Sequence, residues 1–97
     1  MSFKELVTAD QRLVMLRSLH EMPGYEANES ILDSCLDQYG HKISRDAVRT
    51  HISWLAEQGL ITQRELGNTL IAKITGRGID VATGAATVPG VKKPRPE

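Results

Sequence analysis

The sequence has very little of what marks secreted, membrane-spanning or catalytic proteins. It contains one cysteine, Cys35, so no disulfide can form within the chain. No run approaches the ~20 apolar residues of a membrane span, and the first residues lack the apolar stretch of a signal peptide. A Gly-rich phosphate loop, a nucleophile elbow and a His-Glu-x-x-His motif are also missing. We therefore expect a cytoplasmic protein with no membrane contact, no enzymatic activity and no cofactor.

The chain also has no net charge, because 12 lysines and arginines balance 12 acidic residues. The charges are unevenly distributed: residues 1–40 contain seven acidic and three basic side chains, whereas residues 41–77 contain six basic and three acidic ones. Since the distribution of charge governs what a surface attracts, a neutral sum does not exclude a nucleic-acid partner. The chain is polarised, with an acidic first half and a mildly basic second half.

What the chain does have is the periodicity of a small helical domain. Its 97 residues, 40% of them hydrophobic, suit one globular domain. Leu13, Leu16 and Leu19 form an apolar stripe at helical spacing. This stripe predicts a helix over about 8–22, capped by Thr8 and ended by Pro23.

Two further helices are predicted to follow close together. The second begins after the cap Asn28 and ends before Gly40, and the third begins at Ser44 and stops at Gly59. The third helix has a buried face made of Ala47, Val48, Ile52, Leu55 and Ala56. Because only a short linker separates Gly40 from Ser44, the two helices must meet at a steep angle, which is a helix-turn-helix.

The period then changes from helical to extended. Two β-leaning runs, 60–66 and 69–74, flank Gly67-Asn68 and predict a two-stranded hairpin. Thr75 is placed to cap a short final helix that ends at Gly84. Three prolines after residue 85 predict a flexible tail over 85–97, which leaves the domain in 1–84. The expected fold class is mainly α with a small β-hairpin.

This order of elements resembles a winged helix-turn-helix. The segment from Val48 to Ile61 is similar to the recognition-helix signature of ArsR-type and MarR-type bacterial regulators, and Thr75-Gly76-Arg77-Gly78 resembles the Thr-x-x-Gly that follows their wing. The resemblance implies a three-helix core, a short two-stranded wing and a short C-terminal helix. The whole chain, with its Val-Pro-Gly-Val-Lys-Lys-Pro ending, also resembles small proteins of transposable Mu-like phages and prophages.

The polar side of helix 44–58 carries the main candidate contacts to DNA. In a helix-turn-helix, the start of the second helix faces the major groove. The candidates on this side are Ser44, Arg45, Asp46, Arg49, Thr50 and Ser53. Arg45 and Arg49 lie one turn apart and can reach guanine edges or phosphates, and the short hydroxyls suit phosphate contacts. The alternative is a solvated helix face in which Arg49 pairs with Asp46 or Ser53.

Other candidates lie on the hairpin and the tail. The hairpin tip has no lysine or arginine, while Arg64 and Lys73 on its strands either contact phosphates or are ordinary exposed strand residues. In the tail, Lys92, Lys93 and Arg95 form either an electrostatic arm or a solubilising end. The histidines and Cys35 show no recognised ligand spacing, so no metal site is expected.

Two remaining residues of helix 44–58 have expected structural roles. His51 is expected to pack or to make a backbone hydrogen bond. Trp54, the single tryptophan, is expected to cover the junction between helix and hairpin or a dimer contact.

Together these residues favour a phage-associated transcriptional regulator that reads double-stranded DNA with helix 44–58. A homodimer is expected, because one domain offers one recognition helix. The alternative is a winged helix that binds a phage or host protein, which the neutral charge and the bare hairpin tip favour. The charges around Arg45 and Arg49 discriminate the two. A continuous positive stripe including Arg64, Lys73 and Arg77 favours DNA, and carboxylates that interrupt it favour the protein partner.

Overall fold

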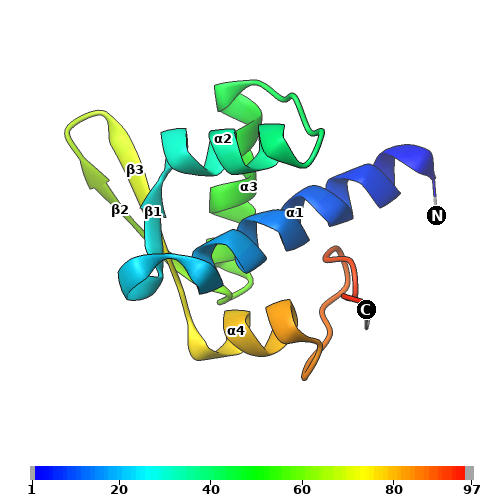
Figure 1. The fold of residues 1–97 in the computed structure, drawn as a ribbon. Helices are drawn as coiled ribbons and strands as arrows, with labels where there is room; N and C mark the ends of the chain where they lie inside the picture. Colours follow the sequence, from blue (N-terminus) through cyan, green and yellow to red (C-terminus); the bar gives the residue numbers. More distant parts are fainter. Residues whose placement is uncertain (1, 96–97) are drawn as a thin grey trace.

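Four helices and a three-stranded antiparallel sheet make up the computed structural model, which describes residues 2–95 (Figure 1). The elements in chain order are α1 (Phe3–Glu21), a 3₁₀ turn (Pro23–Tyr25), β1 (Glu26–Asn28), α2 (Glu29–Gln38), α3 (Arg45–Glu57), β2 (Ile61–Leu66), β3 (Thr69–Ile74) and α4 (Gly76–Thr83). The fold is mainly helical, as predicted. Along the described residues, no helix combines the length and the apolar character needed to cross a membrane.

α1 begins earlier than the sequence periodicity predicts. Its cap is Ser2 and not Thr8, because Ser2 Oγ accepts a hydrogen bond from the Glu5 backbone N–H at 3.1 Å. The prediction was wrong because the apolar stripe starts only at Ala9, whereas Phe3 on the first turn is 81% exposed. The first turns of α1 therefore project beyond the helices that cover the rest of it (Figure 1).

The predicted starts of α2 and α3 are confirmed. Asn28 accepts a hydrogen bond from the Ile31 backbone N–H, and Ser44 accepts one from the Ala47 backbone N–H. Gly59 reverses the chain after α3 with φ +75°, in the left-handed region that glycine adopts without strain. The ends of α3 are thus fixed by the two residues from which they were predicted.

The sheet has one strand more than predicted. The hairpin forms around Gly67-Asn68, with Leu66 opposite Thr69, and β1 then pairs antiparallel with β3 to give the order β1-β3-β2. The sequence prediction missed β1 because a strand of three residues is too short to show alternation. The strand leads directly into α2, so it ties the start of that helix to the hairpin.

The core lies between the helices and the inner side of the sheet. Its side chains without exposed surface are Met15, Leu16, Leu19, Leu32, Leu36, Val48, Ile52, Leu55, Leu60 and Ala72. α4 packs so tightly on the chain after α3 that Gly78 has no room for a β-carbon. That atom would lie 2.6 Å from Ile74 Cγ1 and nearer still to the Leu60 carbonyl oxygen. Glycine at this position is therefore a packing requirement.

Residues 85–95 lie against the body of the protein, which differs from the flexible tail predicted from residue 85. Val88 and Val91 are buried, and the Lys92 backbone N–H donates a hydrogen bond to the Ala9 carbonyl oxygen at 3.2 Å. The prediction rested on the prolines and gave no weight to the two valines, whose burial favours packing. Residues 96–97 of the predicted tail lie outside the described residues.

Candidate interaction surface on α3 and the hairpin

The outward side of α3 carries the six residues predicted to contact DNA, and two of their hydroxyls are already engaged. Ser44 Oγ caps the helix, and Thr50 Oγ1 donates a hydrogen bond to the Asp46 carbonyl oxygen at 3.0 Å. Asp46, Thr50 and Ser53 are exposed, since the helix packs on its opposite side through Val48, Ile52 and Leu55. The helix thus presents a short polar surface to solvent.

Arg49 is held in an ion pair with α2 and does not project freely. Its Nε donates to both carboxylate oxygens of Glu29, at 3.0 and 3.1 Å, and its Nη2 donates to the Asn68 carbonyl oxygen at 2.9 Å. The expected alternative partners, Asp46 and Ser53, are not the ones it uses. Arg49 therefore links α3 to α2 and to the tip of the hairpin.

Glu29 is the centre of this network. Its side chain is 5% exposed, and besides Arg49 it accepts a hydrogen bond from the Leu70 backbone N–H at 2.6 Å. The Arg49 hydrogen bonds and then the Leu70 N–H hold the pKa of Glu29 below its usual value, although burial opposes this shift. The carboxylate is therefore charged and fully used inside the protein.

Arg45 also lies near carboxylates of α2, but at longer distances than Arg49. Its guanidinium lies 3.5 Å from Glu29 Oε1 and 3.6 Å from Asp33 Oδ2, and its side chain remains 48% exposed. Both arginines at the start of α3 thus face carboxylates of α2. Their positive charge is largely offset where a DNA backbone would meet it.

The structure separates Arg64 and Lys73 from the arginines of α3. Ile61, Ala72 and Ile74 point into the core, and side chains alternate along a strand, so Arg64 and Lys73 lie on the outer face of the sheet. Arg64 pairs there with Glu26 of β1 at 3.3 Å, whereas Lys73 is exposed. These two predicted contacts therefore do not join one stripe with Arg45.

Carboxylates without a cationic partner remain on the α3 side of the molecule. Asp46, Glu57 and Glu65 are exposed, and none has a lysine or arginine nitrogen within 4.0 Å among residues 2–95. Hydrogen bonding to Glu29 raises the pKa of Arg49, and the nearby charges of Glu65 and Asp46 add to this effect. We call the surface formed by Asp46, Thr50, Ser53, Glu57 and Glu65 the α3 face. It has no continuous positive stripe.

The flank of α3 that faces α1 has a structural role. His51 Nε2 lies 2.8 Å from Gln11 Oε1, and Arg12 Nε donates to His51 Nδ1 at 3.4 Å. Burial, followed by the charge of Arg12, lowers the pKa of His51 to about 4. His51 packs as predicted, but its partner is a side chain and not the backbone. Trp54 lies under the Arg12 guanidinium, at 3.8 Å.

Metal ligands do not gather in the described part of the chain. No group of three or more His, Cys, Asp or Glu side chains within residues 2–95 is placed to hold a metal ion. Cys35 is a partly buried free thiol on α2.

Sequence reasoning missed Glu29, the residue that most determines the site. Its position directly after the cap Asn28 indicates only an acidic residue in the first turn of the helix. Glu29, Leu32 and Leu36 follow the i, i+3, i+7 spacing of one buried helix face. That spacing was the available signal that the carboxylate points inward and needs a partner.

Comparison with known proteins gives relatives along nearly the whole chain. No protein-family model matches the sequence. The chain is 55% identical over 92 residues to the uncharacterized protein gp26 of Escherichia phage Mu, and the match covers 95% of each chain. It is also 55% identical over 98 residues to an uncharacterized protein of Haemophilus influenzae, covering 100% of this chain and 95% of the relative. The resemblance to small phage proteins is thereby confirmed.

Proposed function

The chain belongs to the family of the phage Mu protein gp26, and we propose that it is a winged helix-turn-helix protein that binds a protein partner through its α3 face. The fold part of this proposal is supported by the order of elements. Two helices joined by a short linker, α2 and α3, are followed by a hairpin and a closing helix, which resembles the order in ArsR-type and MarR-type regulators. The fold alone does not determine the function, so we infer the function from the charges on the α3 face.

The observation that carries the proposal is the charge left exposed on the α3 face. Arg45 and Arg49 are offset by Glu29 and Asp33, while three exposed carboxylates on the same side have no lysine or arginine nitrogen within 4.0 Å in residues 2–95. A surface of this sign repels the phosphate backbone, on which nonspecific DNA affinity depends. It attracts a protein surface rich in lysine or arginine.

The Arg49–Glu29 network suits a docking surface because it makes the surface rigid. It fixes α3 against the hairpin tip through Asn68 and against β3 through Leu70. Interfaces whose backbone is held in place before binding lose less conformational entropy on association. Arg49 acts here as a positioning residue.

DNA binding is the second candidate, and one observation favours it. Arg45 is nearly half exposed and its carboxylate contacts are long, so its guanidinium can turn outward at little cost. The exposed Ser53 hydroxyl lies on the same helix and is a short donor for phosphate. A regulator that reads the major groove would use these two residues first.

The test of the protein-binding proposal is a titration of the ¹⁵N-labelled chain with a lysine-rich peptide at several salt concentrations. We expect amide shifts concentrated on α3 and the hairpin, with an affinity that falls as salt rises. The Asp46→Asn/Glu65→Gln variant should lose most of this binding. The control Glu5→Gln/Asp80→Asn changes the same charge elsewhere and should keep it. Shifts spread evenly over the molecule, or equal loss in both variants, would contradict the proposal.

A further inference from the structure

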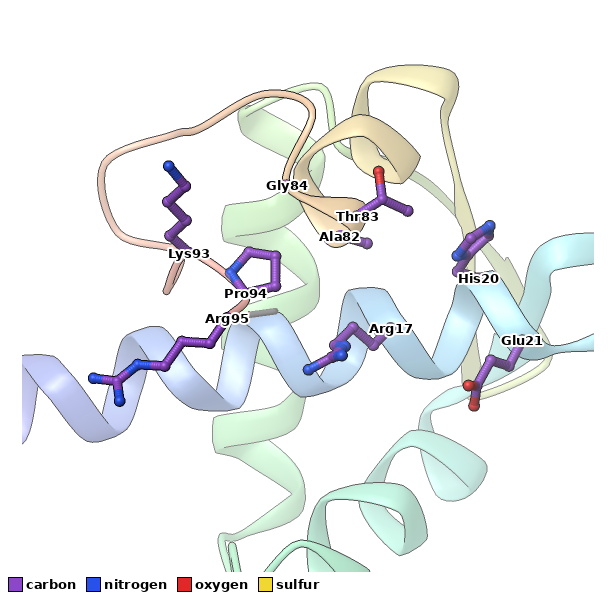
Figure 2. Close-up of a pocket in the computed structure, with 9 residues that line it drawn as sticks. All are labelled: Arg17, His20, Glu21, Ala82, Thr83, Gly84, Lys93, Pro94 and Arg95. Atoms are coloured by element: carbon purple, nitrogen blue, oxygen red, sulfur yellow. The ribbon is translucent and has the colours of Figure 1, made fainter. Parts of the chain in front are cut away.

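The far side of α1 carries a second charged feature, which the α3 face does not use. A cavity of about 470 Å³ lies between α1, the end of α4 and residues 93–95. Figure 2 shows Arg17 and Arg95 in front of α1 and Lys93 on the loop beside them, with α3 passing behind α1. We call the site lined by Arg17, Lys93 and Arg95, together with His20 and Thr83, the cationic pocket.

The three cations of this pocket lack ion-pair partners in the described part of the chain. No carboxylate oxygen of residues 2–95 lies within 4.0 Å of Arg17, Lys93 or Arg95. One acidic residue, Glu21, lines the cavity beside them. This differs from the start of α3, where each arginine faces a carboxylate. The charged ends of the three side chains point in different directions around the cavity (Figure 2). A bound anion that drew them together would offset the repulsion between their like charges.

The packing of the tail explains why Lys93 and Arg95 line the same cavity as Arg17. Val88 and Val91 are buried, and Arg12 Nη1 donates a hydrogen bond to the Gly90 carbonyl oxygen at 3.1 Å. Gly90 has φ +96°, and a β-carbon there would lie 2.7 Å from Trp54 Cζ2. The tail is thus held by its backbone, its valines and the ion pair between Lys92 and Asp10 at 3.5 Å. The charged ends of Lys93 and Arg95 are not used in holding it.

We propose that the cationic pocket binds a phosphate group. Two guanidinium groups and an ammonium group supply the donors that phosphate oxygens accept, and arginine can present two parallel N–H donors to one phosphate. The phosphate can belong to a free small molecule or to the backbone of a nucleic acid, and the titration below separates these sources. The proposal is independent of the α3 face, because the two surfaces share no residue.

The experiment is an NMR titration of the ¹⁵N-labelled full chain with inorganic phosphate, with sodium chloride adjusted to keep the ionic strength constant. We expect shifts at the amides of residues 82–84, Lys93 and Arg95. The variant Arg17→Gln/Lys93→Gln should weaken binding about tenfold or more, since it removes two charge-assisted contacts. Arg77→Gln, at the other end of α4, removes the same kind of charge and should bind as the wild type does. The single variant Lys93→Gln, on the exposed tail, repeats the test if the double variant unfolds.

A parallel titration with a short duplex DNA identifies the source of the phosphate. Shifts at the same amides with both ligands support a nucleic-acid backbone, and shifts with phosphate alone support a small phosphorylated molecule. If neither ligand shifts these amides, or if Arg17→Gln/Lys93→Gln and Arg77→Gln bind equally, the proposal is wrong.

Discussion

At the scale of single residues, the buried carboxylate of Glu29 matters more than any exposed charge. Its oxygens accept hydrogen bonds from Arg49 and from the Leu70 backbone, which join α2, α3 and β3 at one point. Removing one member of such a buried group leaves the other donors without partners. The stability of the α3 face should therefore depend on this residue.

The variant Glu29→Ala tests this dependence. We expect it to lower the free energy of unfolding by roughly 2 kcal/mol, because it leaves the Leu70 N–H without its acceptor and Arg49, whose side chain is 39% exposed, without its ion-pair partner. Glu57→Ala removes an exposed carboxylate and should change stability by less than about 0.5 kcal/mol. Urea unfolding measures both. Equal effects of the two substitutions would mean that the Glu29 network does not stabilise the fold.

A second prediction at the scale of single residues concerns the stability of the protein at acidic pH. The pKa of His51 is about 4 in the folded protein and 6.5 without burial. Between these values the unfolded chain binds a proton that the folded chain does not, so stability rises with pH across this window and falls on acidification. We expect a loss of up to about 3 kcal/mol from pH 6.5 to pH 4.

The measurement is the free energy of unfolding in urea at a series of pH values. In His51→Gln, whose side chain does not titrate, the slope between pH 6.5 and 4.5 should be much smaller. The pKa of Glu29 is lowered in the folded state, so its contribution is present above its unfolded pKa and is lost as pH falls through its folded value. A wild-type slope that persists unchanged in His51→Gln would contradict the assignment to His51.

At the scale of elements, one glycine allows α4 to pack closely on the rest of the protein. Gly78 lies where a β-carbon would collide with Ile74 and Leu60, whereas a β-carbon at Gly76 meets no atom within 4 Å. Both glycines lie in the same helix, so replacement by alanine gives them a similar gain in helix propensity. Any difference between the two substitutions therefore reports the packing of α4.

We expect Gly78→Ala to destabilise the protein by about 2 kcal/mol or more, and Gly76→Ala to be neutral or stabilising by up to about 1 kcal/mol. The comparison is made by the midpoints of thermal or urea unfolding. If Gly78→Ala is as stable as Gly76→Ala, α4 does not pack on Leu60 as described.

The helices and strands also differ in how well they could be predicted from the sequence. Caps and turn residues act locally, so Asn28, Ser44 and Gly67-Asn68 predicted α2, α3 and the hairpin correctly. β1 was missed because its three residues form a strand only by pairing with β3, far along the chain. The valines of the tail were missed for the same reason, since their partners lie on other elements.

The site was less predictable than the fold. The positions of Arg45 and Arg49 on the polar side of α3 were predicted from helical spacing, but their partners were not. Glu29 and Asp33 lie on a different helix, α2. They contact the two arginines only because α2 packs on α3. Which charges remain free is a property of the packed structure, and the α3 face could not be read from a list of charged residues.

At the scale of the whole molecule, the neutral sum of charges hides two surfaces of opposite sign. The α3 face exposes Asp46, Glu57 and Glu65, and the cationic pocket on the far side of α1 is lined by Arg17, Lys93 and Arg95. A small protein with two such surfaces can contact two partners at once. The function that we propose depends on the sign of the α3 face.

The most direct test of that sign is the affinity of the chain for duplex DNA, measured at low and at physiological salt for the wild type, Arg45→Gln and Arg17→Gln/Lys93→Gln. If the α3 face binds protein and not DNA, Arg45→Gln should bind DNA no more weakly than the wild type. Any DNA affinity should then disappear only in Arg17→Gln/Lys93→Gln. DNA binding that weakens with salt and is lost in Arg45→Gln would contradict the proposed function and establish α3 as a DNA-reading helix.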